Sequence, residues 1–325
     1  MTQIRIMILK TAAKYFFLFF VLSVSFWSCE REFTPTLPIV SNNIVVEGYI
    51  EASKNPIQSY VIITKSVPFF KSLENISDLY IANAYVWVID STKGDSVQLN
   101  EFCFQSLPEK LKKQAAVLFG VNLDSVGTYF NPCIYIDFYN KIKPKNNQTY
   151  KLHIRLPDGR ELFSSTTIPR LVPVDSVFFI KPPGINNNDT MAQMRVLIHD
   201  PIGKDFYRYL TSTNGGAYIA NRGSVTDDGF FEGQPIKFNL FASVPRGAKA
   251  DASIAGLFKR GDTVSIKFST IDNTTFNFWS TLEYNANSSG SPFASYTIVK
   301  NNIKGGIGVW GGYSDVFIDT IVPRK

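Results

Sequence analysis

The chain has 325 residues, of which 45% are hydrophobic and 18% charged. This apolar content excludes a disordered chain, and the length allows two hydrophobic cores. Three basic residues and no acids lie in residues 1–28, so the remainder has 30 basic and 27 acidic residues, a net charge near +3. A balance this small, without a run of Lys or Arg, excludes the basic surface that nucleic-acid binding requires.

The N-terminus has the layout of an export signal. Arg5, Lys10 and Lys14 precede thirteen uncharged, mainly apolar residues at positions 15–27. As a helix these residues would span about 20 Å, less than the roughly 30 Å of a bilayer's hydrocarbon core. The pattern therefore predicts a signal peptide over residues 1–28 rather than a transmembrane helix.

A cysteine follows the apolar run directly. Ser28-Cys29 resembles the lipobox of bacterial lipoproteins, in which the Cys is acylated and becomes the first residue of the mature chain. Each methylene of the acyl chains would add about 0.8 kcal/mol of membrane binding. Phe26 stands where a strict lipobox has Leu, so a plain secretory peptide followed by a buried Cys29 is the alternative. Residues 29–41 contain two prolines and little to bury, which indicates a tether.

From residue 42 apolar and polar residues alternate in short runs separated by Gly, Pro, Asn and Asp, which predicts antiparallel strands. The clearest run covers residues 150–156, and Pro157-Asp158-Gly159 predicts a turn into the next strand. Comparable runs occupy residues 44–50, 60–64, 84–89, 134–138, 174–180, 194–198, 236–241, 264–268 and 316–321. This spacing predicts a mainly β fold of two β-sandwich domains, similar to immunoglobulin or fibronectin domains, with one or two short helices.

Apolar residues at helical spacing occur in residues 108–119, and in residues 274–284 after a capping Asp272 or Asn273. Both segments predict helices that pack against the sheets. Two prolines separate a finished hairpin from a new strand near residue 172. We therefore expect an N-terminal domain over residues 42–171 and a C-terminal β-rich domain over residues 172–325.

Cys103 and Cys133 are the remaining cysteines, and in an oxidising compartment they have only one intramolecular pairing if Cys29 is acylated. A disulfide would close a loop of about 30 residues and stabilise the fold by roughly 3.5 kcal/mol in the chain-entropy model. Two buried free thiols are the alternative, because strand register cannot be derived from this sequence. No Cys-x-x-Cys occurs, so neither a zinc site nor a thioredoxin-like site is indicated.

Motifs that would carry chemistry are weak. Gly306-Ile-Gly308-Val-Trp-Gly311 has dinucleotide-binding spacing, but only 14 residues follow it and a glycine-rich strand with a bulge fits better. His153 and His199 have no recognisable partners, and the acids of residues 227–232 lack the alternation of a calcium loop. We interpret the histidines as structural or solvated and the acids of residues 227–232 as a solvated turn, and expect no enzymatic activity, no cofactor and no metal.

Six Asp-Ser/Thr-apolar triplets resemble the O-glycosylation motif of proteins exported by Bacteroidota. Their hydroxyl residues are Ser96, Ser125, Ser176, Thr190, Thr263 and Thr320. An Asp-Ser turn followed by Val is also a common beginning of a strand, so a purely structural interpretation stays open.

Several stretches together resemble a family of Bacteroidota lipoproteins that is named only as the domain of unknown function 4249. They are residues 44–50 (Ile-Val-Val-Glu-Gly-Tyr-Ile), 60–70, 168–177, 200–209, 290–294 and 302–314. The last stretch has Trp310 where a small residue or Phe is usual. The resemblance implies two-domain, mainly β lipoproteins of the outer membrane, often encoded beside TonB-dependent receptors, and it implies no catalytic residues.

We therefore expect a non-enzymatic lipoprotein, anchored to the outer membrane, that assists a TonB-dependent receptor through loops of its second domain. Acidic residues directly after Cys29 resemble a surface-export signal, but the cell surface and the periplasmic face both stay open. The alternative is a surface adhesin or glycan-binding module. In that alternative, aromatic side chains exposed on the surface would stack on sugar rings, with these as candidates: Tyr207, Tyr209, Trp279 and Trp310. Core packing is the first explanation for so many aromatic residues in a β-sandwich.

Overall fold

The computed structural model describes residues 43–54, 59–67, 76–109, 111–112, 116, 131–182, 189–243, 251, 253–288 and 297–324. All of them belong to one compact unit formed by residues 41–325. The expected signal peptide over residues 1–28 and the tether over residues 29–41 lie outside the described residues, as does most of the helix expected at 108–119.

The described residues form a mainly β structure with the following strands: β1 (Ile44–Ala52), β2 (Tyr60–Lys65), β3 (Tyr85–Asp90), β4 (Ser96–Gln98), β5 (Asn100–Cys103), β6 (Cys133–Ile136), β7 (Gln148–Arg155), β8 (Glu161–Ile168), β9 (Ser176–Ile180), β10 (Met191–His199), β11 (Phe206–Thr213), β12 (Ile219–Asp227), β13 (Pro235–Leu240), β14 (Phe258–Lys259), β15 (Thr263–Ile271) and β16 (Ile307–Ile321). The helix α3 spans Asn273–Ser288, and two short 3₁₀ helices are η1 (Ile76–Leu79) and η2 (Phe104–Ser106). No helix in this described part of the chain has the length and hydrophobicity that crossing a bilayer requires.

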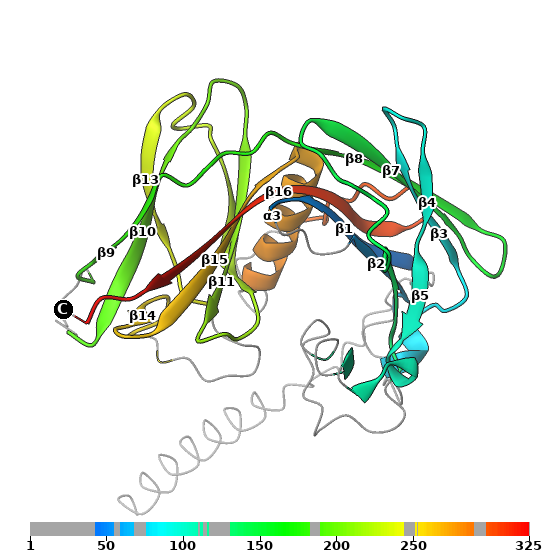
Figure 1. Cartoon of the computed structure of the whole chain (residues 1–325), viewed down its shortest axis with the longest axis horizontal. Helices are drawn as coiled ribbons and strands as arrows, with labels where there is room; N and C mark the ends of the chain where they lie inside the picture. The colour runs from blue at the N-terminus through cyan, green and yellow to red at the C-terminus, as the bar shows by residue number, and fades with distance from the viewer. Residues whose placement is uncertain are drawn as a thin grey trace, which may run out of the picture. The chain divides into compact units, whose positions relative to one another are not determined.

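The strands form two β-sandwiches that share one long sheet (Figure 1). The long sheet has the order β12-β11-β15-β16-β1-β2-β6-β5. Its β1–β2 half packs on the sheet β4-β3-β7-β8 around a core that includes Val46, Val86 and Leu152. Its β11–β15 half packs on β13, β10, β14 and β9 around a core that includes Val196 and Phe268. The predicted mainly β fold of two sandwiches is confirmed.

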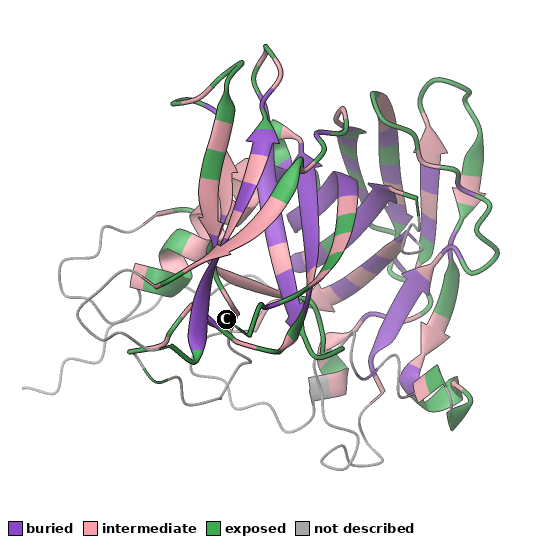
Figure 2. Ribbon diagram, turned by 60° about the vertical axis from the view of Figure 1, so that its left-hand side comes forward, coloured by how far each residue is buried: buried purple, intermediate pink, exposed green. Residues whose placement is uncertain are grey.

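Each strand predicted from alternation overlaps an observed strand, and the largest difference is at β16, which begins nine residues before the predicted run over residues 316–321. Strand β11 lacks such alternation because both of its faces are covered: Tyr207 and Tyr209 point into the second core, whereas Phe206 packs with residues on the opposite face of the long sheet. Figure 2 shows strands with alternating buried and exposed bands beside strands that are buried along much of their length. The period-2 pattern is therefore lost in a strand such as β11, where large apolar residues occupy both buried faces.

Strand β16 belongs to both sandwiches. It pairs in antiparallel register with β15 over residues 313–321 and in parallel register with β1 over residues 307–314. The pairing with β1 is continuous, so the expected glycine-rich strand is present without the expected bulge. The division expected between residues 171 and 172 lies in the connection between β8 and β9. This division into two domains stays a prediction, because β16 returns from the second sandwich to the first.

Glycine is required where β16 meets β1. Gly308 has a φ of +122°, and a Cβ at this position would lie 1.9 Å from the carbonyl oxygen of Val46. Two residues later, Trp310 is fully buried in the first core and its indole Nε1 donates a hydrogen bond to the carbonyl oxygen of Tyr150, 3.1 Å away. Gly48 makes room for this indole, since a Cβ there would be 2.8 Å from the Trp310 ring.

Helix α3 covers the face of the long sheet that points away from the two sandwich cores. Asp272 caps it, because one carboxylate oxygen accepts a hydrogen bond from the backbone N–H of Thr275 at 2.8 Å. Phe276 and Trp279 pack with Tyr49 and Tyr313 of the sheet. The predicted helix over residues 274–284 is confirmed.

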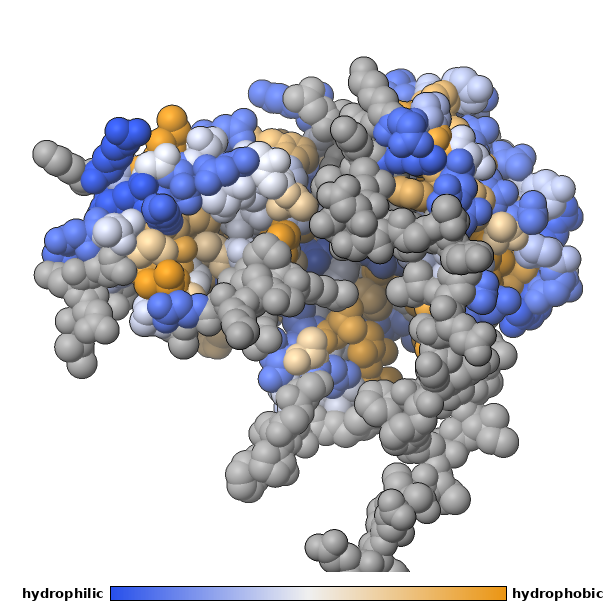
Figure 3. All heavy atoms as spheres, turned by 90° about the horizontal axis from the view of Figure 1, so that it is seen from below, coloured by the Kyte–Doolittle hydropathy of each residue, from blue (hydrophilic) through white to orange (hydrophobic). Residues whose placement is uncertain are grey.

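Seen from below, hydrophobic residues gather in the hollowed middle of the unit, while most of the surrounding surface is hydrophilic (Figure 3).

We expect Gly308→Ala to lower the free energy of unfolding by at least about 3 kcal/mol, because a methyl group has no space beside Val46. Gly159→Ala is the matched control. Its φ is +87° and nothing lies within 4 Å of the added Cβ, so it tests only the cost of a left-handed backbone, about 1–2 kcal/mol. Urea unfolding checks both variants, and equal losses would contradict the steric role of Gly308.

Candidate ligand-binding site

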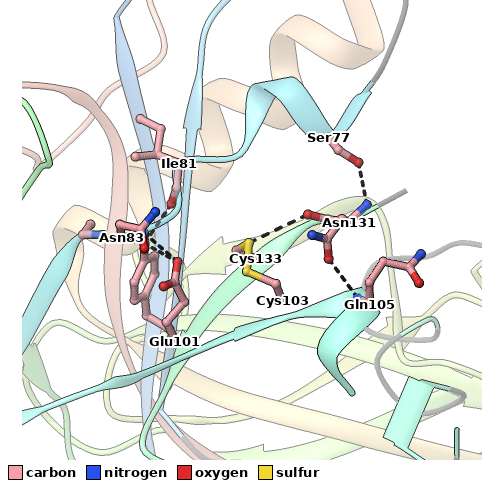
Figure 4. The surroundings of a disulfide bond; sticks show 10 residues. Ser77, Ile81, Asn83, Glu101, Cys103, Gln105, Asn131 and Cys133 are labelled. Atoms are coloured by element: carbon pink, nitrogen blue, oxygen red, sulfur yellow. Dashed lines mark hydrogen bonds between the residues drawn. A yellow bond between two sulfur atoms is a disulfide. The ribbon is translucent and has the colours of Figure 1, made fainter. Parts of the chain in front are cut away.

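The structure joins Cys103 and Cys133 by a disulfide, whereas Cys29 lies outside the described residues. The two cysteines are directly opposite each other in the antiparallel pair of β5 and β6. Figure 4 shows Asn131 beside the bridge, where its backbone N–H donates to the hydroxyl of Ser77 at 2.6 Å. Since the sulfurs are bonded to each other, they offer no thiolate to a metal. The bridge is therefore a structural element of the first sandwich.

Three of the predicted O-glycosylation residues are the first residues of β4, β9 and β15: Ser96, Ser176 and Thr263. Thr190 directly precedes β10 and Thr320 is near the end of β16, while Ser125 lies outside the described residues. Positions at strand beginnings agree with the structural interpretation of the triplets. Of the five residues of this set that the structure describes, Thr320 is half-buried and the other four are exposed. Modification of these residues stays a prediction.

The aromatic residues named as candidates for sugar stacking are buried or half-buried, which agrees with core packing and not with exposure to a ligand. Trp310, Tyr207 and Tyr209 are buried, and Trp279 is half-buried with the guanidinium of Arg208 over its ring at 3.4 Å. Tyr207 and Tyr209 line a partly open pocket of about 290 Å³ in the second sandwich. These side chains are used for packing, as their size favours.

The two histidines lie in different sandwiches. His199 ends β10 and its Nδ1 is 2.5 Å from a carboxylate oxygen of Asp175. His153 is on β7, and its Nε2 lies 3.6 Å from Glu161 of the neighbouring strand. They therefore do not contribute to one common site.

A different set of aromatic rings forms a row on the outward face of the first sandwich. Tyr85 and Trp87 of β3 stack at 5.8 Å, Trp87 stacks on His153 at 5.2 Å, and His153 stacks on Phe163 of β8 at 4.6 Å. Arg155 covers the Tyr85 end of the row, with its guanidinium 4.9 Å from the ring centroid. Phe163 at the other end is 43% exposed, and so its ring remains available to a ligand.

A groove of about 580 Å³ lies at the Phe163 end of the row. Besides Phe163, it is lined by Lys151 and Ser165 on the outward face of β7 and β8, and by residues 301–304, which precede β16. The backbones of Phe163 and Lys304 exchange two hydrogen bonds, of 3.1 and 2.8 Å. The segment 301–304 is therefore held beside the edge of β8 and forms the second wall of the groove.

Some polar groups of the groove already form hydrogen bonds within the protein. The side-chain amide of Asn302 donates to the carbonyl oxygen of Trp310 at 2.8 Å and accepts from its N–H at 2.9 Å, and Ser164 donates to the carbonyl oxygen of Asn302 at 2.7 Å. In contrast, Lys151 and Lys304 are exposed, and neither forms an ion pair with a described residue. The groove thus combines a fixed backbone with two free cations and an aromatic ring.

The sequence pattern did not predict this groove. Period-2 alternation places Lys151 and His153 on the same face of β7. This shared face was the part of the groove that the sequence could indicate. The partners of this face, Phe163 and Lys304, come from another strand and from a segment about 140 residues later. Their proximity depends on the return of β16 to the first sandwich.

Three carboxylates meet in the second sandwich. Asp200, Asp205 and Asp228 are buried, with one oxygen of each within 4.8 Å of the others. Asp228 was expected in a solvated turn, and this expectation is wrong, because it accepts a hydrogen bond from the backbone N–H of Asp205 at 2.6 Å. Arg170 pairs with Asp205, while Tyr207 donates to Asp200. Burial raises the pKa of Asp205, and the positive charge of Arg170 opposes this shift. The cluster is thus an ion network within the protein.

A second buried ion cluster crosses three adjacent strands of the long sheet. Lys267 of β15 pairs with Glu51 of β1, and its Nζ lies 3.4 Å from a carboxylate oxygen of Asp315 of β16. One ammonium group is therefore shared by two carboxylates. Burial raises the pKa of Glu51 to about 7, although the attraction of Lys267 opposes the shift.

This raised pKa predicts a pH dependence of stability. Since the folded chain holds the Glu51 proton more tightly than the unfolded chain, stability should fall as pH rises from 4.5 to about 7. We expect Glu51→Gln to flatten the free energy of unfolding across this range. Asp158→Asn is the control, because a hydrogen bond from Arg160 lowers the pKa of this exposed acid to below the range. An unchanged slope in Glu51→Gln would contradict the assignment.

Comparison with known proteins places the chain in a family without assigning an activity. No curated protein was found that matches the sequence. The family model described as "Domain of unknown function (DUF4249)" matches residues 30–316, which include every observed strand except the last five residues of β16. The chain therefore belongs to the DUF4249 family.

Proposed function

We propose that this chain is a non-enzymatic binding lipoprotein, held at the outer membrane through an acylated Cys29, that assists a TonB-dependent receptor by binding a ligand. The export signal and the lipobox-like Ser28-Cys29 support the location, and the family resemblance supports the partner. The groove beside Phe163 is the observation that carries the binding role.

The groove has the properties of a binding site that is formed before its ligand arrives. Its walls are β7, β8 and a segment tied to β16, so little backbone ordering would be needed on binding. Phe163, Lys151 and Lys304 supply an aromatic surface and two ammonium groups. Such groups suit stacking and hydrogen bonding rather than proton transfer, which favours binding over catalysis.

A surface adhesin or glycan-binding module that acts without a receptor is the second candidate. The same exposed ring of Phe163 favours it, because sugars are commonly bound by aromatic stacking together with a few polar groups. The two candidates share the ligand site and differ in the partner.

A pull-down separates the two candidates. We expect the tagged full-length chain, recovered from gently detergent-solubilised outer membranes, to bring one TonB-dependent receptor in stoichiometric amount, as identified by mass spectrometry. Cys29→Ala should lose this receptor because the chain is no longer anchored beside it. Phe163→Ala should retain the receptor, since the groove serves the ligand. Recovery of the chain alone would contradict the receptor role and favour the adhesin.

A further inference from the structure

We infer that the groove beside Phe163 selects acidic oligosaccharides, in which a carboxylate is carried on the sugar ring as in uronic acids. This inference deepens the proposed function and rests on its binding role, because it names the chemical class of ligand for the same site. It is carried by the juxtaposition of one exposed aromatic ring and two ammonium groups that form no ion pair with any described residue.

The aromatic ring provides the stacking surface. One side of Phe163 is stacked on His153 with an angle of 10° between the ring planes, which fixes its orientation, and 43% of the residue remains exposed. The apolar face of a pyranose ring packs on such a surface. Stacking alone accepts neutral and acidic sugars equally.

The charges of the groove provide the selection. Lys151 projects from β7 and Lys304 belongs to the opposite wall, so a ligand in the groove lies beside two ammonium groups. The described lining contains no carboxylate. Glu161, an acid on the same strand as Phe163, is beside His153 instead. The site therefore has an uncompensated positive charge, which an anionic ligand would neutralise.

The remaining groups fit a hydroxyl-rich ligand. Ser165 is paired with Lys151 in the register of β7 and β8, and Asn301 lies on the other wall; both are exposed. Hydroxyl and amide groups donate to and accept from sugar hydroxyls. The volume of about 580 Å³ is within the roughly 300–1,000 Å³ of small-molecule sites. A uronic acid combines the stacking face, the hydroxyls and the negative charge in a single ring.

Isothermal titration calorimetry of the full-length chain in detergent tests this inference, with galacturonic acid oligosaccharides as the probe and neutral galactose oligosaccharides of the same length as the comparison. We expect the acidic probe to bind at least about tenfold more tightly, equivalent to about 1.4 kcal/mol. Its affinity should fall as salt is raised, because salt screens exposed charges.

Variants assign the effect to the groove. Lys151→Ala and Lys304→Ala should each weaken binding of the acidic probe about tenfold, since a hydrogen bond to a charged group is lost. Phe163→Ala should weaken both probes, and its thermal unfolding should match that of the unchanged chain. Lys93→Ala is the matched control, because Lys93 is an exposed lysine in the turn between β3 and β4, outside the groove.

Equal affinity for acidic and neutral probes would overturn the selection by charge and leave the binding role intact. Binding of neither probe at millimolar concentration would overturn the inference as a whole. The receptor role is then still decided by the pull-down, so failure of the ligand class and failure of the proposed function are distinguishable. Loss of acidic binding in Lys93→Ala to the same extent as in Lys304→Ala would also contradict the groove as the site.

Discussion

The close contact between Gly308 and the backbone of Val46 is the constraint on which the two-sandwich structure depends. A Cβ on Gly308 would overlap the carbonyl oxygen of Val46, so only glycine permits β16 to approach β1 in this conformation. Beyond this point β16 continues along β15. Strand β16 therefore pairs with both halves of the long sheet, and the two cores form on the same face of a continuous backbone network.

The same strand builds the candidate site. The segment 301–304 leads into β16. The side-chain nitrogen and oxygen of Asn302 both form hydrogen bonds with the backbone of Trp310. Trp310 is in turn buried in the first core. Packing of an indole inside the sandwich thus helps to hold the segment with Lys304 beside Phe163. The groove is a consequence of the sheet topology.

The buried charged residues lie where the two sandwiches are connected. Lys267, Glu51 and Asp315 come from the three strands that meet at the centre of the long sheet, and Arg170 extends from the link between β8 and β9 to Asp205. Ion networks of this kind contribute little net stability, because desolvation offsets attraction. They do penalise arrangements in which a partner is missing. We infer that they favour the observed alignment of the two halves over alternatives with the same hydrophobic pattern.

The sequence by itself determined the strands whose faces are half-exposed, the helix after Asp272, the glycine-rich strand and the layout of an export signal, because each is encoded in local spacing of residues. It did not reveal β11, whose two buried faces remove the alternation, or the burial of Tyr207 and Trp310, which depends on what covers them. Pairing of Cys103 with Cys133 required the register of β5 and β6. The groove required Phe163 and Lys304 to meet across about 140 residues, and only the tertiary structure decided this, since strand order and register are properties of the whole sheet rather than of any one segment.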